Sequence, residues 1–253
     1  MANPGHLNNP PIVEALVDLR VVNETPLEEA AFEPIIPFLI EKYPKVEWRR
    51  TLRAEFTAPK HADSSAKAVT QDVGFHGLVM TNEARTWVAQ FRPDGFTLSR
   101  VREYTTGDEL LGEALNLWAL YAETVGATAV IRIALRYINR LLLPFRAGED
   151  FDRFLTAAIV MPGGTPQTIS EFVTRAVAHR EPQHPDSPIS IVTQRLEPAS
   201  EDAAPFVLDI DVFRTGEFKP EGASLLPILA ELREVKNNLF FAFLKDEALE
   251  AYR

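Results

Sequence analysis

The sequence of 253 residues contains no cysteine. A disulfide, a thiolate ligand for zinc or an iron–sulfur cluster, and a cysteine nucleophile are therefore excluded. Histidine is scarce as well, with five residues and no His-Glu-x-x-His spacing. The chain also lacks the Gly-x-Ser-x-Gly turn of serine hydrolases and the glycine-rich loops that hold nucleotide phosphates. From these absences we predict no identifiable catalytic residue, no metal site and no cofactor.

Basic residues are in the minority, because 26 Lys and Arg oppose 36 Asp and Glu for a formal charge of −10. Arg49, Arg50 and Arg53 cluster beside Trp48, a combination that can stack on single-stranded nucleic acid. Both halves of the chain are acidic, however, so the overall electrostatic field opposes polyphosphate. We therefore disfavour nucleic acid as a partner.

Long uncharged apolar runs are also absent. The most apolar stretch, residues 127–143, contains three arginines that would be costly inside a bilayer. Residues 1–11 hold no Lys, no Arg and no apolar run, unlike a secretory or transit signal. We expect no membrane span and a cytoplasmic location.

The first half of the chain shows strand and helix patterns in a clear order. Period-two alternation predicts strands, and the capping boxes at Thr25–Glu28 and Thr106–Glu109 predict helix starts. Pro34 and Pro37 should delay or kink the first helix. The predicted order is a strand at 11–22, a helix at 25–43, a strand at 47–58 and a loop at 59–71. Three further strands follow at 74–81, 86–92 and 96–102, and then a helix at 106–125.

The second half repeats this order. The predicted elements are a strand at 128–143, a short helix at 151–156, strands at 169–179, 189–196 and 206–214, and a helix at 222–243 whose apolar stripe includes Lys236. We predict an α+β fold in which two β-α-β-β-β-α halves, 11–126 and 127–253, form one broad antiparallel sheet. The long helices would pack on one face, in a single fused domain spanning 1–253. The alternative is an α+β protein in which the repeated order is coincidence.

Several segments resemble those of a known family. They are Asn9-Pro-Pro-Ile-Val-Glu-Ala-Leu-Val-Asp-Leu-Arg20, the stretch from Gln90 to Arg100, Leu135-Arg-Tyr-Ile-Asn-Arg140, Asp209-Ile-Asp-Val-Phe213 and Lys236-Asn-Asn-Leu-Phe-Phe241. Together they resemble a sporadically distributed family of uncharacterised bacterial proteins of about 250 residues. The resemblance implies no activity, cofactor or catalytic residue.

Charged residues on otherwise apolar strands are the main candidates for a site. Arg132, Arg136 and Arg140 share one face of the predicted strand at 128–143, opposite a face that includes Asn139. The candidate acids on other strands are Glu14, Asp18, Asp209 and Asp211. If the first strands of the two halves are neighbours, Glu14 and Asp18 could pair with Arg136 and Arg140.

Two interpretations of this charged face stay open. In the first, the arginines bind a phosphate or carboxylate in a polar groove that the acids help to shape. In the second, the face is solvated or forms a dimer interface crossed by salt bridges. Asp209 and Asp211 are also a possible start of a divalent-cation site, but no third ligand is evident.

The sequence favours a protein that acts by binding a partner protein or a small anionic ligand, rather than by catalysis. An alternative is an enzyme acting on a nucleotide or phosphate ester through the Arg and Asp residues of the sheet face. The apolar excess at 239–244 is either core or a protein-interaction patch, and a homodimer is possible.

Overall fold

A computed structural model describes residues 5, 7–23, 27–57, 67–144, 151–181, 184, 186–198 and 203–253, with the backbone alone described for 52–57 and 67–73. Within this part of the chain, no helix is both long and apolar enough to cross a membrane.

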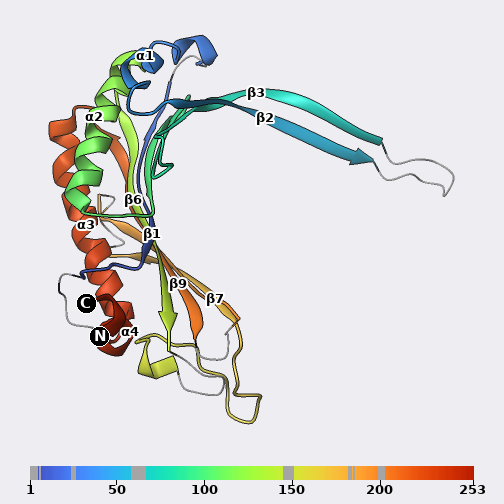
Figure 1. Ribbon diagram of the computed structural model, residues 1–253, viewed down its shortest axis with the longest axis vertical. Coiled ribbons are helices and arrows are strands. Elements are labelled where there is room, and N and C mark those ends of the chain that lie inside the picture. Colours follow the sequence, from blue (N-terminus) through green and yellow to red (C-terminus); the bar gives the residue numbers. More distant parts are fainter. Residues whose placement is uncertain are drawn as a thin grey trace.

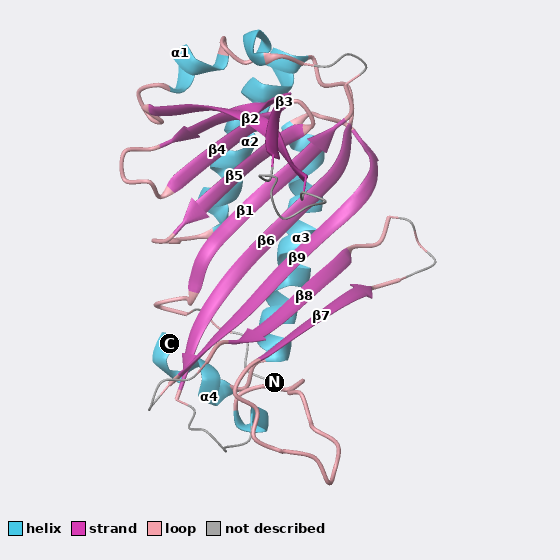
Figure 2. Cartoon of the chain, turned by 90° about the vertical axis from the view of Figure 1, so that its right-hand side faces the viewer, coloured by secondary structure: helices cyan, strands magenta, loops and turns pink. Residues whose placement is uncertain are grey.

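Nine strands form one fully antiparallel sheet in the order β2-β3-β4-β5-β1-β6-β9-β8-β7 (Figure 2). The strands are β1 (Ile12–Val21), β2 (Lys45–Thr57), β3 (Lys67–Thr81), β4 (Trp87–Arg92), β5 (Gly95–Val101), β6 (Val130–Leu143), β7 (Phe172–His179), β8 (Ile189–Leu196) and β9 (Ala204–Phe218). The α+β class and the broad antiparallel sheet predicted from the sequence are confirmed.

Two long helices, α2 (Gly107–Val125) and α3 (Gly222–Phe243), run along the same face of the sheet (Figure 1). The Thr106 hydroxyl accepts a hydrogen bond from the Glu109 N–H and begins α2 as predicted, and Gly126 ends it in the left-handed conformation at φ 65°. The Trp118 indole N–H donates to the Pro220 carbonyl at 2.7 Å, which ties α2 to the segment that leads into α3.

The hydrophobic core lies between the sheet and these helices. Alternate residues of the central strands, such as Val17, Leu135 and Ile210, are fully buried on the helix side. The other face of the sheet is concave, and the β2–β3 hairpin projects away from it at one end (Figure 1). The period-two pattern therefore separates an apolar helix side from a charged open side.

The structure corrects the first predicted helix. Instead of a helix over 25–43, the described residues form a single 3-10 turn at Glu29–Ala31 and a five-residue helix, α1 (Ile35–Leu39). Pro34 explains the break before α1, because proline lacks the N–H that continues a helix and its ring clashes with the preceding turn, whereas Pro37 is tolerated in the first turn of α1.

Other boundaries also differ from the prediction. The predicted loop at 59–71 is shorter, because β3 already begins at Lys67, and 58–66 lie outside the described residues. The short helix after 151 is only a 3-10 turn, Phe151–Arg153, and β7 begins at Phe172. The chain ends in α4 (Asp246–Leu249) and a 3-10 turn, Glu250–Tyr252, which the sequence did not predict.

Candidate functional site

Asp18 is the centre of the charged open face. Its carboxylate accepts hydrogen bonds from Thr97 at 2.6 Å, Arg20 at 2.9 Å, Arg132 at 2.9 Å and Arg92 at 3.0 Å, and the residue is only 6% exposed. Burial favours the neutral acid, but the hydrogen bond from Thr97 and the charges of Arg20 and Arg92 outweigh burial and hold the pKa of Asp18 below its usual range. Asp18 is thus a buried anion with complete hydrogen bonding.

The other predicted residues pair on neighbouring strands. Arg132 also donates to Asp211 at 3.1 Å, and Arg136 makes a bidentate contact with Asp209 at 2.8 and 2.6 Å. Arg140 contacts Glu197 at 3.2 Å. The predicted arginines are therefore already neutralised by carboxylates.

These partners differ from the expected ones because of strand register. Asp18 on β1 faces Ala134 on β6, and Glu14 faces Ile138, so neither acid lies directly opposite an arginine. Asp18 reaches Arg132 diagonally. Glu14 has no ion pair within 4.0 Å in the described part of the chain, although its charge helps to raise the pKa of Arg136.

A small hollow of about 220 Å³ opens between β6, β7, β8 and β9, lined by Arg136, Arg175, Asp209 and Asp211 together with two uncharged side chains. Its charges balance, with two cations against two anions. Burial raises the pKa of Asp211, although Arg132 and Arg136 oppose the shift. Among the residues described, no group of three or more His, Cys, Asp or Glu side chains is placed to hold a metal ion.

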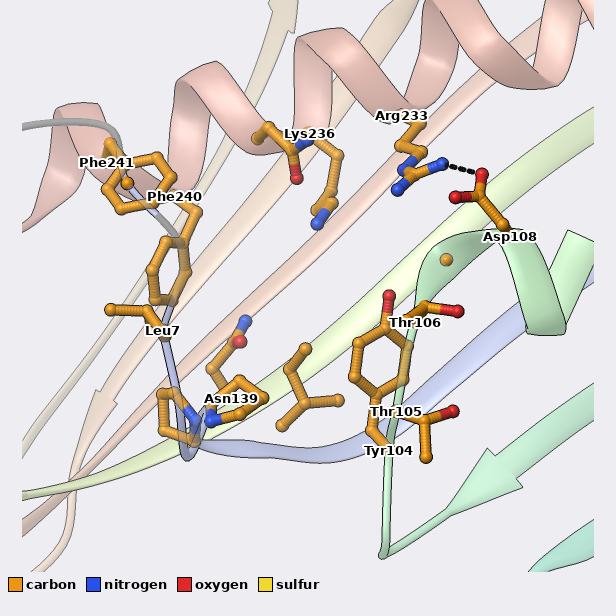
Figure 3. A pocket seen from close by; sticks show the side chains of 16 residues that line it. Leu7, Tyr104, Thr105, Thr106, Asp108, Asn139, Arg233, Lys236, Phe240 and Phe241 are labelled. Carbon is orange, nitrogen blue, oxygen red and sulfur yellow. Dashed lines mark hydrogen bonds and ion pairs between the residues drawn. The ribbon is translucent and has the colours of Figure 1, made fainter. Parts of the chain in front are cut away.

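A second cavity, of about 260 Å³, lies on the opposite side of the sheet beneath α3 (Figure 3). The N-terminal segment of residues 7–12 forms part of its wall and is held by hydrogen bonds from the Asn9 N–H to the Tyr252 carbonyl at 3.2 Å and from the Arg140 N–H to the Pro11 carbonyl at 2.8 Å. The rim includes exposed residues such as Thr105, Asp108 and Asn237, so the cavity is accessible from solvent.

Lys236 on α3 points into this cavity (Figure 3). The residue is 8% exposed, and its Nζ lies 3.9 Å from the centroid of the Tyr137 ring. No carboxylate or hydrogen-bond acceptor contacts this Nζ among the described residues. Burial, reinforced by the charge of Arg233, lowers the pKa of Lys236 to about 7. A buried lysine without an acidic partner is costly, which makes it a strong candidate for function.

A polar end of the cavity is formed where α3 meets the beginning of α2. Arg233, one turn before Lys236, pairs with Asp108 at 2.5 Å, and the Asp108 side chain is largely exposed. The Arg233 guanidinium packs so closely against Gly107 that an added Cβ would lie 2.7 Å from its Nε. The N-terminus of α2 contributes a partial positive charge at the same place.

The floor of the cavity carries polar groups from β6 and from the segment before α2. Tyr104 lines the cavity, and its hydroxyl oxygen lies 3.3 Å from that of Tyr137, a buried residue of β6 that does not line the cavity. Burial raises the pKa of both phenols, so both remain protonated at neutral pH. Asn139, only 2% exposed, donates to the Leu208 carbonyl at 3.0 Å and lines the cavity below Lys236 (Figure 3).

The opposite end of the cavity is apolar. Leu7, Phe240 and Phe241 line it, and the two phenylalanine rings pack edge to face with centroids 5.2 Å apart. Phe240 is buried, so part of the apolar excess predicted at 239–244 is core. The cavity thus combines a cationic end with an apolar end.

Comparisons with protein-family models, curated proteins and solved structures find no match to this chain.

The sequence did contain a signal for the cavity. Lys236 occupies an apolar stripe of α3, and Asn139 shares the apolar face of β6. A polar residue at a position whose neighbours are all core is unusual, because it must be desolvated. The prediction instead selected the open-face arginines, whose alternation with apolar residues is more conspicuous.

Proposed function

We propose that this protein binds a small anionic ligand with an apolar body in the cavity beneath α3. The proposal rests above all on Lys236, a buried cation in a solvent-accessible cavity with no acidic partner among the described residues. An anionic ligand would supply the counter-charge that the described residues do not give the protonated lysine.

The polarity of the cavity supports this class of ligand. Lys236, Arg233 and the N-terminus of α2 are grouped at one end, where Asp108 is the one acid among the described residues that line the cavity. A carboxylate or phosphate fits there, and Phe240 and Phe241 favour an apolar group at the other end. The volume of about 260 Å³ is slightly below the usual range for ligand cavities, about 300–1,000 Å³, so the ligand must be small.

The charged open face supports ligand binding less well. Each of the predicted arginines already contacts a carboxylate, so an incoming anion would have to displace Asp209, Asp211 or Glu197. Releasing such a pair leaves a partly buried acid without its partner. We favour the cavity over the predicted groove for this reason.

We also infer that the two halves of the chain are structural repeats. The support is the strand order, in which β1 and β6 lie antiparallel at the centre and each is flanked by the strand that leads into a long helix. On one side this strand is β5, before α2, and on the other it is β9, before α3. The cavity lies where the beginning of α2 meets the C-terminal half of α3.

The test uses three probes of nearly equal shape: phenylacetate, 2-phenylethanol and 2-phenylethylamine. We expect only phenylacetate to raise the melting temperature of the full chain, because a ligand that binds only the native state stabilises it. Calorimetric titration should give one site per chain and a loss of affinity of about tenfold or more in Lys236→Met.

Arg136→Met is the matched control, because it removes a cation from the open face without touching the cavity. Unchanged phenylacetate binding in Arg136→Met supports the cavity. If binding is lost in Arg136→Met and kept in Lys236→Met, the ligand site is on the open face instead. Equal stabilisation by all three probes would overturn the requirement for an anion.

A further inference from the structure

We propose that Lys236 is a nucleophile that forms an imine with the carbonyl carbon of a 2-oxo acid carrying an apolar side chain. This inference rests on the proposed function, because it assigns a ligand class to the same cavity. It adds a covalent step that binding alone does not require.

The surroundings of Lys236 suit a neutral amine. Tyr137 packs against the amine, Asn139 lies below it, and the positive charge of Arg233 lowers the pKa of Lys236 further. No acid among the described residues holds the proton on Nζ. Burial and the adjacent cation both favour the uncharged form, which carries the lone pair needed for attack.

The position of Arg233 specifies where the carboxylate of the ligand would lie. Residues three apart on a helix are neighbours on its surface, so Arg233 and Lys236 project toward the same side of α3. In a 2-oxo acid the carboxylate is bonded directly to the carbonyl carbon. The carboxylate can therefore contact Arg233 and the N-terminus of α2 while the carbonyl carbon faces Lys236.

The remaining cavity residues match the rest of such a ligand. Tyr104 stays protonated and lines the cavity, so its hydroxyl can donate a hydrogen bond to the carbonyl oxygen. Phe240 and Phe241 provide an apolar wall for the side chain attached to the third carbon. Each part of the ligand thus has a counterpart in the cavity.

The step is balanced without an oxidant, a reductant or a metal. The Nζ lone pair attacks the carbonyl carbon, and the oxygen gains a proton as the nitrogen loses one, giving a carbinolamine. Loss of the hydroxyl with a proton releases one water and forms the C=N bond. The resulting imine can be protonated, which would keep positive charge beside the carboxylate.

Reductive trapping tests the inference directly. The full chain is incubated with phenylpyruvate and cyanoborohydride at pH 7.5, and intact mass and peptide mapping locate the product. We expect one adduct per chain at Lys236, at least about tenfold above any of the other lysines, because ordinary exposed lysines are almost fully protonated at this pH. 3-Phenyllactate, which has a hydroxyl in place of the 2-oxo group, should compete for the cavity without forming an adduct.

Lys236→Arg is the matched variant, because arginine keeps the positive charge but is not a nucleophile at this pH. It should yield no adduct while still binding 3-phenyllactate. Lys236→Met provides a second variant, and far-ultraviolet circular dichroism shows whether each variant is folded.

The outcomes separate the two proposals. If 3-phenyllactate binds in a Lys236-dependent manner but phenylpyruvate gives no adduct at Lys236, the imine is wrong and anion binding stands. If neither acid binds the wild-type chain, both proposals fail. Adducts spread evenly over several lysines would overturn the special reactivity of Lys236.

Discussion

The Nζ of Lys236 lies 3.9 Å from the centroid of the Tyr137 ring, and this ring is its one specific interaction partner among the described residues. A cation–π contact is a modest compensation for a desolvated ammonium, about 0.5–2 kcal/mol. We therefore expect Lys236 to lower the stability of the free protein and to serve ligand binding.

Replacing Lys236 with methionine should stabilise the free protein at pH 7. The folded-state pKa of about 7 lies below the ordinary lysine value of about 10.5, so the protonated amine is less stable in the folded state than in the unfolded state. By linkage, replacing the lysine with methionine should raise the free energy of unfolding by about 2–4 kcal/mol. Urea unfolding measures this, with the exposed Lys219→Met as a control expected to change little.

The same substitution should remove a pH dependence of stability. Between pH 7 and 10.5 the unfolded wild type binds more protons at this position than the folded state, so stability rises with pH in that window. The cost of the charged lysine is fully present below pH 7. The excess in the free energy of unfolding of Lys236→Met over the wild type should therefore shrink as the pH is raised. An excess that stays constant would show that Lys236 is not desolvated.

Binding of phenylacetate should weaken as the pH rises above 7. An anion binds best to the protonated lysine, and the fraction of free protein in that form falls above the pKa of about 7. The dissociation constant should increase by up to about tenfold per pH unit between pH 7 and 9. Calorimetry in buffers of different ionisation enthalpy should also detect proton uptake, which Lys236→Arg should lack.

Asp18→Asn should destabilise the protein strongly. The change removes the carboxylate that three arginines share, Arg20, Arg92 and Arg132, and leaves them without their common counter-charge. We expect a loss of about 2–3 kcal/mol at pH 7. Glu14→Gln, which breaks no ion pair among the described residues, is the control and should change stability by less than about 0.5 kcal/mol.

The sign of the pH effect at Asp18 is fixed by its lowered pKa. Its ionisation contributes stability above the unfolded value of 3.8, and this contribution is lost as the pH falls through the lower folded-state pKa. The difference in the free energy of unfolding between the wild type and Asp18→Asn should therefore become smaller at low pH. A difference that persists unchanged at low pH would contradict the electrostatic origin.

Gly95→Ala should also be destabilising, because the turn between β4 and β5 requires glycine. Gly95 has φ +152°, and an added Cβ would lie 2.2 Å from the Leu19 carbonyl oxygen on β1. The clashing atom belongs to the backbone and cannot move aside as the end of a side chain can. We therefore expect the free energy of unfolding to fall by about 2 kcal/mol or more. Gly112→Ala, in α2 with nothing within 4 Å of the new Cβ, should instead stabilise by about 1 kcal/mol.

Much of the fold was predictable because local rules agreed with the tertiary packing. The alternation in β1 and the capping residues of α2 indicated elements whose bounds differ from the predicted ones by no more than one residue at either end. The first helix begins only at Ile35, a delay that the prolines indicated, and it is much shorter than predicted; Thr25 of its capping box lies outside the described residues. The C-terminal α4 was missed because four residues are too short for a periodic pattern.

The candidate site was less predictable. The sequence indicated which arginines share a face of β6, but partner choice depended on the register between β1, β6 and β9. A shift in pairing changes which acid each arginine can reach. The cavity depended on long-range contacts among the N-terminal segment, the beginning of α2 and the C-terminal half of α3.

By itself the sequence determined the absence of thiol chemistry, the acidic net charge and the alternation that makes an α+β antiparallel sheet. These properties depend on composition or on neighbours a few residues apart. Only the tertiary structure decided that Asp18, Asp209, Asp211 and Glu197 neutralise the open-face arginines and that Lys236 is buried with no carboxylate partner among the described residues. Desolvation and charge pairing depend on distances between residues remote in sequence, and folding alone establishes those distances.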